Sequence, residues 1–402
     1  MVFTLEALKA AYGDALLLHF GDPKAPCLAV IDGGPHGVYN SVLKPRLNKL
    51  MENRRRLIDG QLPIRLLMVS HIDDDHVNGV LEMANELADA PGQKPYQIES
   101  LWHNSFDDIL GNNGQELAAS LEPFVKNVLT TGKMPTNTPL KNYHAALVMA
   151  SVKQGRDLRN AAKRLGWDVN KEFGGKLVRL PKDGARKIPI AEGMTLTPLG
   201  PREANVEALS AQWDKEIQQM GVAVDAARAA EYADQSVFNL SSIVVLAEMP
   251  GNDGRPRRML LTGDARGDHI IEGIEVAGLM DNGTCHVDLL KLPHHGSDRN
   301  MEPAFFKTVT ADHYVISSNG DKFDNPDQDT LEWLAAARKG TGHFTVYLTY
   351  PVLEFKFKKR KKIQKEIQAF IDAGKKSGDY TVICRAPNAL SVCVDLGEPL
   401  EE

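Results

Sequence analysis

Three short segments of this sequence hold histidine and aspartate side chains of the kinds that bind a divalent metal ion. In chain order they are His71-Ile-Asp73-Asp-Asp75-His76, Leu260-Leu-Thr-Gly263-Asp264 and Lys291-Leu-Pro-His294-His295-Gly296-Ser297. Imidazole and carboxylate groups suit zinc or manganese, and a divalent ion needs several of them converging from separate parts of the chain. Such a centre supports metal-assisted hydrolysis, because a bound ion lowers the pKa of water from about 16 to near 7 and so provides a hydroxide nucleophile.

Each segment taken singly has a plainer interpretation. An Asp-rich loop is often only a solvated turn, a Gly-Asp pair is often part of a β-turn, and neighbouring histidines can be packing residues. Motifs with several parts in a fixed order rarely arise by chance. The three segments together therefore favour the metal interpretation.

The surrounding patterns predict strands that end where these side chains begin. Short apolar runs bounded by turn residues predict strands at 15–20, 28–31, 64–69, 194–197, 242–246 and 259–261. The strand at 64–69 ends just before His71, and apolar residues at helical spacing over 77–87 predict a helix beyond His76. The turn at 250–254 predicts a hairpin. The acidic-histidine cluster is thus expected on a loop between a strand and a helix, where side chains can converge on a ligand.

The middle and the end of the chain have different patterns. Residues from about 104 to 185 predict a largely helical insertion, in which a helix at 147–165 is ended by Gly166. A basic C-terminal extension is predicted from about 351 to 402. The length of 402 residues allows two domains. We interpret the chain as one domain that carries this insertion and extension.

The composition is that of a globular protein with a core, at 43% hydrophobic and 25% charged residues. The net charge of −6 excludes a general attraction of the surface to nucleic acid, which would need a local basic patch. No apolar run approaches the roughly 20 residues that cross a bilayer, the N-terminus lacks the order of a secretory signal, and the four scattered cysteines form no CxxC pair. We therefore expect a cytoplasmic protein with reduced cysteines and no membrane association.

The order of the motifs resembles the metallo-β-lactamase superfamily, and more closely the β-lactamase-like domain of ComEC, the bacterial DNA-uptake channel protein. The likeness spans residues 1 to about 335, without the insertion. The residues that carry it are Tyr12-Gly-Asp-Ala-Leu-Leu-Leu18, Ile31-Asp-Gly-Gly34, Ser70-His-Ile-Asp-Asp-Asp-His76, Asn239-Leu-Ser-Ser-Ile-Val-Val245, Leu260-Leu-Thr-Gly-Asp-Ala265 and Leu290-Lys-Leu-Pro-His-His-Gly-Ser297. The resemblance implies an α/β protein with the αββα four-layer sandwich.

The resemblance also implies a set of metal ligands. It gives His71, Asp75, His76 and Asp264, with Asp264 bridging two ions, and Asp73 as a further ligand. The last ligand is His294 or His295, of which we favour His295; the other would support the site. Asp75 and Lys291 are the candidate catalytic residues.

Two departures from the commoner superfamily pattern change the expected metal. Asp73 stands where a histidine is usual, and another histidine is replaced near 239–241. Fewer imidazoles make the site richer in oxygen, so we expect one or two divalent ions, Zn²⁺ or Mn²⁺. A site reduced to one metal or without catalysis is the alternative that these departures leave open.

Other polar residues near the motifs have candidate roles. Asp32 is expected to brace a ligating histidine through that ring's second nitrogen. His103 is expected to line the cleft or to hydrogen-bond a neighbouring loop. Lys291 and Ser297 are candidate contacts to an anionic substrate, and a surface lysine with a turn serine is an equally good interpretation.

The substrate class depends on the resemblance and on one basic run. The ComEC-like motifs imply a phosphodiester within nucleic acid. Phe355-Lys-Phe-Lys-Lys-Arg-Lys-Lys362 combines charge with aromatic rings, which is typical of single-strand binding, and Lys358, Lys359, Arg360 and Lys361 are the candidate contacts. A solvated helix start is the plainer interpretation of this run. The alternative functions are hydrolysis of a small or cell-envelope ester, such as a phosphorylcholine ester or a lactone, and a non-catalytic binding protein with a degenerate metal site.

Overall fold

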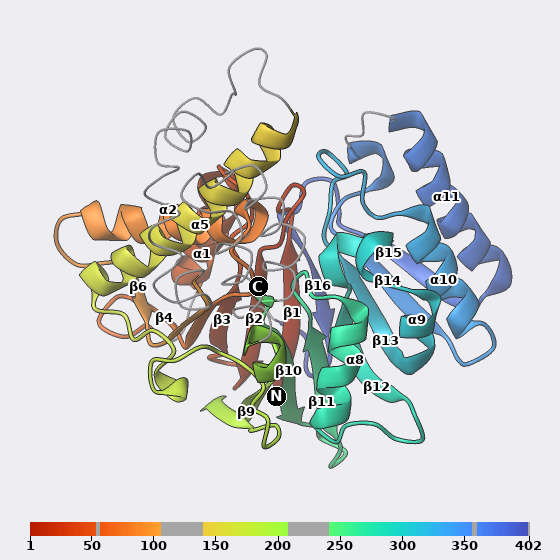
Figure 1. Ribbon diagram of the computed structural model, residues 1–402, viewed down its shortest axis with the longest axis horizontal. Coiled ribbons are helices and arrows are strands. Elements are labelled where there is room, and N and C mark those ends of the chain that lie inside the picture. Colours follow the sequence, from red (N-terminus) through yellow and green to blue (C-terminus); the bar gives the residue numbers. More distant parts are fainter. Residues whose placement is uncertain (54–56, 106–139, 208–240, 356–359, 401–402) are drawn as a thin grey trace, which may run out of the picture.

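Two β-sheets form the centre of the computed structural model, which describes residues 1–53, 57–105, 140–207, 241–355 and 360–400 (Figure 1). The first sheet has six strands in the order β16-β1-β2-β3-β5-β7, and the second has eight in the order β15-β14-β13-β12-β11-β10-β9-β8. A separate pair joins β4 to β6. The α/β class expected from the sequence is confirmed.

The strands of the first sheet and of the separate pair are β1 (Val2–Leu8), β2 (Leu16–Gly21), β3 (Cys27–Ile31), β4 (Leu62–Ile64), β5 (Leu66–Val69), β6 (Tyr96–Ile98), β7 (Leu101–His103) and β16 (Ser391–Asp395). Those of the second sheet are β8 (Ile188–Ala191), β9 (Met194–Gly200), β10 (Val244–Pro250), β11 (Pro256–Leu261), β12 (Cys285–Lys291), β13 (Val309–Ile316), β14 (Phe344–Leu348) and β15 (Tyr380–Cys384). Within the first sheet β3, β5 and β7 run parallel, and within the second so do β11 to β15.

The helices lie on both sides of this pair of sheets (Figure 1). The main ones are α1 (Lys44–Asn53), α2 (Asp74–Asp89), α5 (Leu140–Leu165), α8 (Gly267–Val276), α9 (Pro303–Thr308), α10 (Gln328–Arg338) and α11 (Arg360–Ser377). No helix within the described part of the chain is both long enough and apolar enough to span a membrane.

Buried apolar side chains form three clusters. One is shared by the first sheet with α1, α2 and α5, the second contains side chains of both sheets, and the third is shared by the second sheet with α8 to α11. Successive residues of a strand enter different clusters: Leu17 contributes to the first, and Leu16 and Leu18 to the second. Side chains alternate across a strand, so a sheet covered on both faces needs apolar residues at every position. The strand sequences are therefore unbroken apolar runs because both faces of each sheet are buried.

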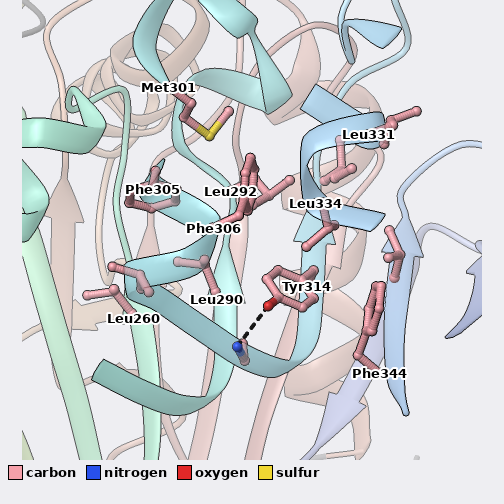
Figure 2. Close-up of a cluster of buried hydrophobic side chains, with 14 of the residues drawn as sticks. Leu260, Leu290, Leu292, Met301, Phe305, Phe306, Tyr314, Leu331, Leu334 and Phe344 are labelled. Atoms are coloured by element: carbon pink, nitrogen blue, oxygen red, sulfur yellow. Dashed lines mark hydrogen bonds between the residues drawn. The ribbon is translucent and has the colours of Figure 1, made fainter. Parts of the chain in front are cut away.

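Figure 2 shows the third cluster, where helical phenylalanines and leucines pack on the second sheet. Phe305 and Phe306 of α9 and Leu331 and Leu334 of α10 lie against the strand residues. The hydroxyl of Tyr314, within this apolar region, accepts a hydrogen bond from the backbone N–H of Ala311 at 2.9 Å. The buried phenol oxygen is thus satisfied.

The segment predicted as a C-terminal extension contributes an edge strand to each sheet. β15 pairs with β14, and β16 pairs with β1, whose Leu5 lies opposite Val394. Helix α11 packs on the second sheet through Ile367 and Phe370. This last part of the chain is therefore built into the core.

The segment predicted as a helical insertion also reaches the core. The described part of α5 contributes Leu158, Ala161 and Ala162 to the first cluster, and the helix ends at Leu165, where Gly166 has a φ of +69° as its predicted stop position requires. Residues 106–139, within the same predicted insertion, lie outside the described residues.

Candidate metal centre

The first motif sits where β5 passes into α2. The strand ends at Val69, His71 lies in the connecting loop, and α2 begins at Asp74, so Asp75 and His76 occupy its first turn. The sequence placed the whole motif on a loop. The helix starts earlier because carboxylates in a first turn interact favourably with the positive end of the helix dipole.

Helix α2 is held against the end of β3 by two glycines. A Cβ on Gly79 would collide with the carbonyl oxygen of Gly33, and the N–H of Gly33 donates to the carbonyl of His76 at 2.9 Å. Only glycine allows this approach of helix to loop. The contact sets Asp32, next to Gly33, beside the ring of His76.

The second motif comes from the other sheet. Asp264 follows β11 after a turn in which Gly263 has a φ of +50° and packs against Ser70. The N–H of Ile243 donates to the carbonyl of Ser70 at 2.7 Å, and the N–H of Asp264 donates to Ser242 Oγ at 3.3 Å. These bonds join the ends of β5 and β10 and bring Asp264 to the first motif.

The third motif is a tight turn, Pro293–Gly296, after β12. His295 is fully buried within it, and its Nε2 atom lies 3.3 Å from Asp75 Oδ2 and 3.5 Å from Asp264 Oδ1. His76 Nε2 lies 3.1 Å from the same Asp264 oxygen and 4.0 Å from Asp75 Oδ1. Donor atoms of Asp75, His76, Asp264 and His295 all lie within 4.8 Å of one another.

The chemistry of this donor set fits a divalent cation. His76 Nε2, His295 Nε2 and Asp264 Oδ1 are buried and make no hydrogen bond within the described part of the chain. The two nitrogens lie 3.1 and 3.5 Å from Asp264 Oδ1 without forming a hydrogen bond to it. Buried polar atoms that make no hydrogen bond are costly, so three of them converging on one point indicate a ligand that satisfies them. Two imidazoles and two carboxylates suit zinc or manganese.

The outer nitrogens of both rings are held by hydrogen bonds. His76 Nδ1 lies 2.9 Å from Asp32 Oδ2, and Asp32 in turn accepts hydrogen bonds from the N–H and hydroxyl of Ser70 at 2.7 and 2.5 Å. His295 Nδ1 lies 3.0 Å from the carbonyl oxygen of Ser317. Such bonds fix the rings with Nε2 toward the centre. The bracing role that the sequence suggests for Asp32 agrees with this geometry.

Asp14 is a residue of the site that the sequence reasoning missed. It is buried behind His295, with Oδ1 3.4 Å from His295 Nδ1 and Oδ2 2.7 Å from Lys291 Nζ. The signal available in the sequence was the Gly13-Asp14 pair before the strand at 15–20, which was interpreted as a turn that bounds this strand and as part of the resemblance. Lys291 is fully buried in this pair and also donates to the carbonyl of Leu292 at 3.0 Å, so its side chain faces protein rather than an approaching substrate.

The charges of the centre are strongly coupled. Burial raises the pKa of Asp75 and of Asp264, but the neighbouring imidazoles outweigh it, so the pKa of Asp75 falls to about 2 and that of Asp264 lies well below its usual value. Burial lowers the pKa of His76 and of His295. The negative charges of the neighbouring carboxylates have the larger, opposite effect and hold both pKa values well above the usual 6.5. A compact group of carboxylates that draws positive charge onto its imidazoles is a group that attracts a cation.

His71 and Asp73 lie at one side of this centre. The side chain of His71 is buried, with its ring edge-on to His76 at 5.4 Å between centroids, and its Nδ1 lies 3.5 Å from Asp73 Oδ2. Burial lowers the pKa of His71 to about 4, which leaves the imidazole in its neutral, metal-binding form at pH 7. Asp73 is partly exposed.

Comparisons with known proteins show a likeness to solved structures alone. No family model matches the chain, and no curated protein matches it. Among the solved structures that resemble it is the metallo-β-lactamase MIM-1 from Novosphingobium pentaromativorans, at 11% sequence identity over 92% of this chain and 93% of that one, with a TM-score of 0.29. A TM-score this low carries no argument, so the site must be judged by its own geometry.

The remaining candidate residues lie in the following places. His103 is buried at the end of β7 with Nε2 3.1 Å from the carbonyl oxygen of Gly155 in α5, so this contact is to a helix and not to the neighbouring loop that the sequence suggested. Ser297 is buried and its Oγ accepts from the N–H of Arg299, so it caps a turn. His294 lies at the centre, with Nε2 3.6 Å from Asp264 Oδ2.

The basic run is only partly described. Phe355 is fully buried in the third core cluster, so its predicted role as a stacking surface for bases is wrong: burying the ring against the sheet leaves it no face for a base. Lys358 and Lys359 lie outside the described residues, as do the side chains of Arg360 and Lys361.

Proposed function

We propose that this chain is a metal-dependent hydrolase with the metallo-β-lactamase fold and its four-layer αββα sandwich. The sequence of clusters, from helices to sheet to sheet to helices, supports the sandwich. The observation that carries the function is the group of four buried donors, Asp75, His76, Asp264 and His295, supplied by the first turn of α2 and by the turns after β11 and β12.

The donors would hold one or two divalent ions, Zn²⁺ or Mn²⁺. When bound, such an ion acts as a Lewis acid and lowers the pKa of a water molecule at the site to near 7. The chain's own residues orient the donors. Asp32 and the Ser317 carbonyl fix the two imidazole rings, and the Asp14–Lys291 pair stands behind His295. A rigid arrangement of this kind avoids reorganisation during the reaction.

For the substrate we propose a phosphodiester, and within that class nucleic acid. Two features support this choice: the resemblance of the motifs to the β-lactamase-like domain of ComEC, and the basic run at 355–362. A centre that stabilises negative charge suits attack on a phosphorus atom.

A small cationic ester is the second candidate, and one observation favours it. A cleft of about 280 Å³ is lined by Pro326, Gln328 and Ile363 together with the acidic residues Asp298, Asp324, Asp327, Asp329 and Glu366. It lies next to the histidine turn, because the N–H of Asp327 donates to the carbonyl of Gly296 at 3.0 Å. Acidic side chains repel a polyanion and attract a cationic group, such as the choline of a phosphorylcholine ester.

The test is a substrate screen on protein loaded with Zn²⁺ or Mn²⁺. We expect turnover of a chromogenic phosphodiester and of at least one of single-stranded DNA, double-stranded DNA and RNA. Asp75→Ala and Asp264→Ala should lower metal content and abolish turnover, because each removes a donor. Asp183→Ala changes the same charge at an exposed position and should preserve both.

Full metal occupancy in both Asp75→Ala and Asp264→Ala would show that these side chains are not ligands. Turnover of a phosphorylcholine ester without turnover of any nucleic acid would replace the first candidate substrate by the second.

A further inference from the structure

A lysine ammonium lies between two aromatic rings that come from different loops. Lys322 Nζ is 4.9 Å from the centroid of the Tyr12 ring and 4.9 Å from the centroid of the Phe323 ring. The two rings stand nearly perpendicular, at 80° with 6.1 Å between their centroids. A cation within about 6 Å of a ring centroid is attracted by the negative face of the ring. Tyr12 and Phe323 therefore form an aromatic corner in which a positive charge is stabilised.

Tyr12 is fixed beside the metal centre. Its hydroxyl donates to Asp74 Oδ2 at 3.0 Å, in the first turn of α2. The next residue, Gly13, lies so close to Asp75 that a Cβ would collide with the Asp75 carbonyl oxygen. The Gly13 carbonyl also accepts a hydrogen bond at 2.7 Å from the hydroxyl of Ser317. The loop that carries Tyr12 is thus held against the helix turn that supplies a metal donor.

Phe323 stands on a loop that is held against the histidine turn. The hydroxyl of Ser318 closes the base of this loop by donating to the carbonyl of Asn325 at 3.0 Å, and Asn325 Nδ2 donates to the carbonyl of His294 at 3.4 Å. Phe323 is 46% exposed and is the only exposed aromatic side chain among the described residues. One exposed apolar residue is ordinary on a protein surface. This ring, however, lies on a braced loop next to the metal centre, with much of its surface open to a ligand.

The charged groups around the aromatic corner are negative, apart from Lys322 itself. In the segment 321–329 every other charged residue is an aspartate. Asp324 lines the acidic cleft described above, and Asp74 accepts the hydrogen bond from Tyr12. Lys322 nevertheless forms no salt bridge within the described part of the chain and lies over the two rings instead. These surroundings attract a cation and repel a polyanion.

The charges decide between two roles for Lys322. As a contact to a phosphate, its ammonium would have to hold an anion among aspartates that repel it. As an internal cation, it occupies the place that the ammonium group of a ligand would take. The lysine is exposed and its stem is flexible, so it can leave the corner for water. The second role is the one that agrees with the surrounding charges.

We propose that the aromatic corner of Tyr12 and Phe323 binds an alkylammonium group of the substrate, and that Lys322 is the internal cation which this group displaces. The inference rests on the proposed function and favours its second candidate, a small cationic ester. A lysine ammonium is compact and strongly hydrated, whereas a quaternary ammonium presents methyl groups to the rings and gives up less hydration. The corner would hold the cationic end of the ester beside the centre that cleaves it.

The test is a binding measurement without turnover, in which choline is the probe. Its control is the uncharged analogue in which carbon replaces nitrogen, because the two molecules have the same shape. NMR titration of the Zn²⁺-loaded protein gives both affinities. Choline is expected to bind more tightly than the analogue by about 2- to 30-fold, the range that a cation–π contact supplies. Phe323→Leu keeps an apolar side chain but removes the ring, so it should lose most of this preference.

Lys322→Met separates the two roles of the lysine. Without the internal cation, choline should bind more tightly than in the wild type, by about 2-fold or more. Lys339→Met removes an exposed lysine outside the corner and should bind choline like the wild type. Unchanged choline binding in Lys322→Met would show that Lys322 does not compete for the corner. Weaker binding of a single-stranded oligonucleotide by Lys322→Met, with choline binding unchanged, would make the lysine a phosphate contact and favour the first candidate substrate.

The proposed function and the aromatic corner can fail separately. Equal affinities of the wild type for choline and its uncharged analogue would overturn the corner and leave the proposed hydrolase intact. A preference for choline in a metal-loaded protein that turns over no ester would leave a cation-binding corner and overturn its role in substrate binding. Because Phe323 and Lys322 are exposed, neither substitution removes a side chain from the core.

Discussion

At the level of single residues, the metal donors depend on an ion pair buried behind them. Asp14 and Lys291 are both only 1% exposed and lie 2.7 Å apart, and Asp14 also faces the Nδ1 atom of His295. Removing two charges from water is costly, and a buried pair recovers that cost only while both partners are present. The pair is thus a poor source of net stability and a sensitive point for substitution.

Asp14→Asn is therefore expected to lower the free energy of unfolding by about 3–5 kcal/mol, because it leaves the buried ammonium of Lys291 without a counter-charge. The double variant Asp14→Asn with Lys291→Met should recover most of this loss, since it removes the stranded charge. Urea unfolding of the wild type, both single variants and the double variant measures the coupling. Asp183→Asn is the exposed control. If the losses of unfolding free energy in the two single variants simply add up in the double variant, Asp14 and Lys291 do not stabilise each other.

At the level of elements, a buried carboxylate ties four of them together. Glu6 of β1 lies 2.9 Å from His19 Nε2 of β2 and accepts hydrogen bonds at 2.6 Å from Arg46 Nε of α1 and from Ser391 Oγ, at the start of β16. The first and last strands of the chain and the helix beside them thus meet at one side chain. No local pattern in the sequence signals this meeting, because the partners lie up to 385 positions apart.

The interactions of Glu6 predict a loss of stability in acid. Burial raises the pKa of Glu6, but His19 and Arg46 outweigh it and lower the pKa from 4.5 to about 2. A carboxylate with a depressed pKa stabilises the folded state fully above pH 4.5, and this contribution is lost as the pH falls toward 2. Lowering a pKa by one corresponds to about 1.4 kcal/mol, so Glu6 contributes on the order of a few kcal/mol.

Glu6→Gln should be less stable than the wild type at pH 6 and should show a shallower decline between pH 4.5 and 2. Chemical unfolding at several pH values measures both. Equal slopes for the two proteins over this range would mean that Glu6 is not the titrating group. Asp183→Asn, which removes an exposed carboxylate, should follow the wild-type slope.

At the level of the whole molecule, the negative overall charge works against the approach of a polyanionic substrate. The net charge is −6, and the cleft beside the histidine turn is lined by acidic side chains. A nucleic acid must therefore be held by a local concentration of basic residues. The run that includes Lys358 to Lys361 is the densest one in the sequence.

Changing Lys358, Lys359, Arg360 and Lys361 together to Ser should weaken binding of a single-stranded oligonucleotide and flatten the dependence of affinity on salt. Each phosphate that the variant no longer neutralises should reduce the slope by about 0.7 for a single strand. Bound metal should not change, because the run contains none of the proposed ligands. Oligonucleotide titrations at several salt concentrations provide the measurement. An unchanged slope would indicate that the run is a solvated helix start. The resemblance to the ComEC domain would then be the remaining support for nucleic acid as the substrate.

The sequence by itself determined the local parts of this protein. Apolar runs predicted the strands and the hairpin of β10 and β11, and helical spacing predicted α2 and the end of α5, because these patterns depend on neighbours in the chain. The single strand expected at 64–69 is instead two strands, divided at Arg65. β4 pairs with β6 and β5 joins the first sheet. Periodicity does not reveal which partner a strand finds.

Of the candidate site, the sequence supplied the residue types and the order of His71, His76, Asp264 and His295. Only the tertiary structure decided how they group, because convergence depends on the meeting of two sheets whose strands lie far apart in the chain. It buried Lys291 against Asp14 and hid Phe355 in the core, where chain-local patterns suggested contact with a substrate. It also set His294 and His295 on opposite oxygens of one carboxylate, through a left-handed turn that no spacing rule predicts. Local patterns specify what a side chain can do, and long-range packing determines what it meets.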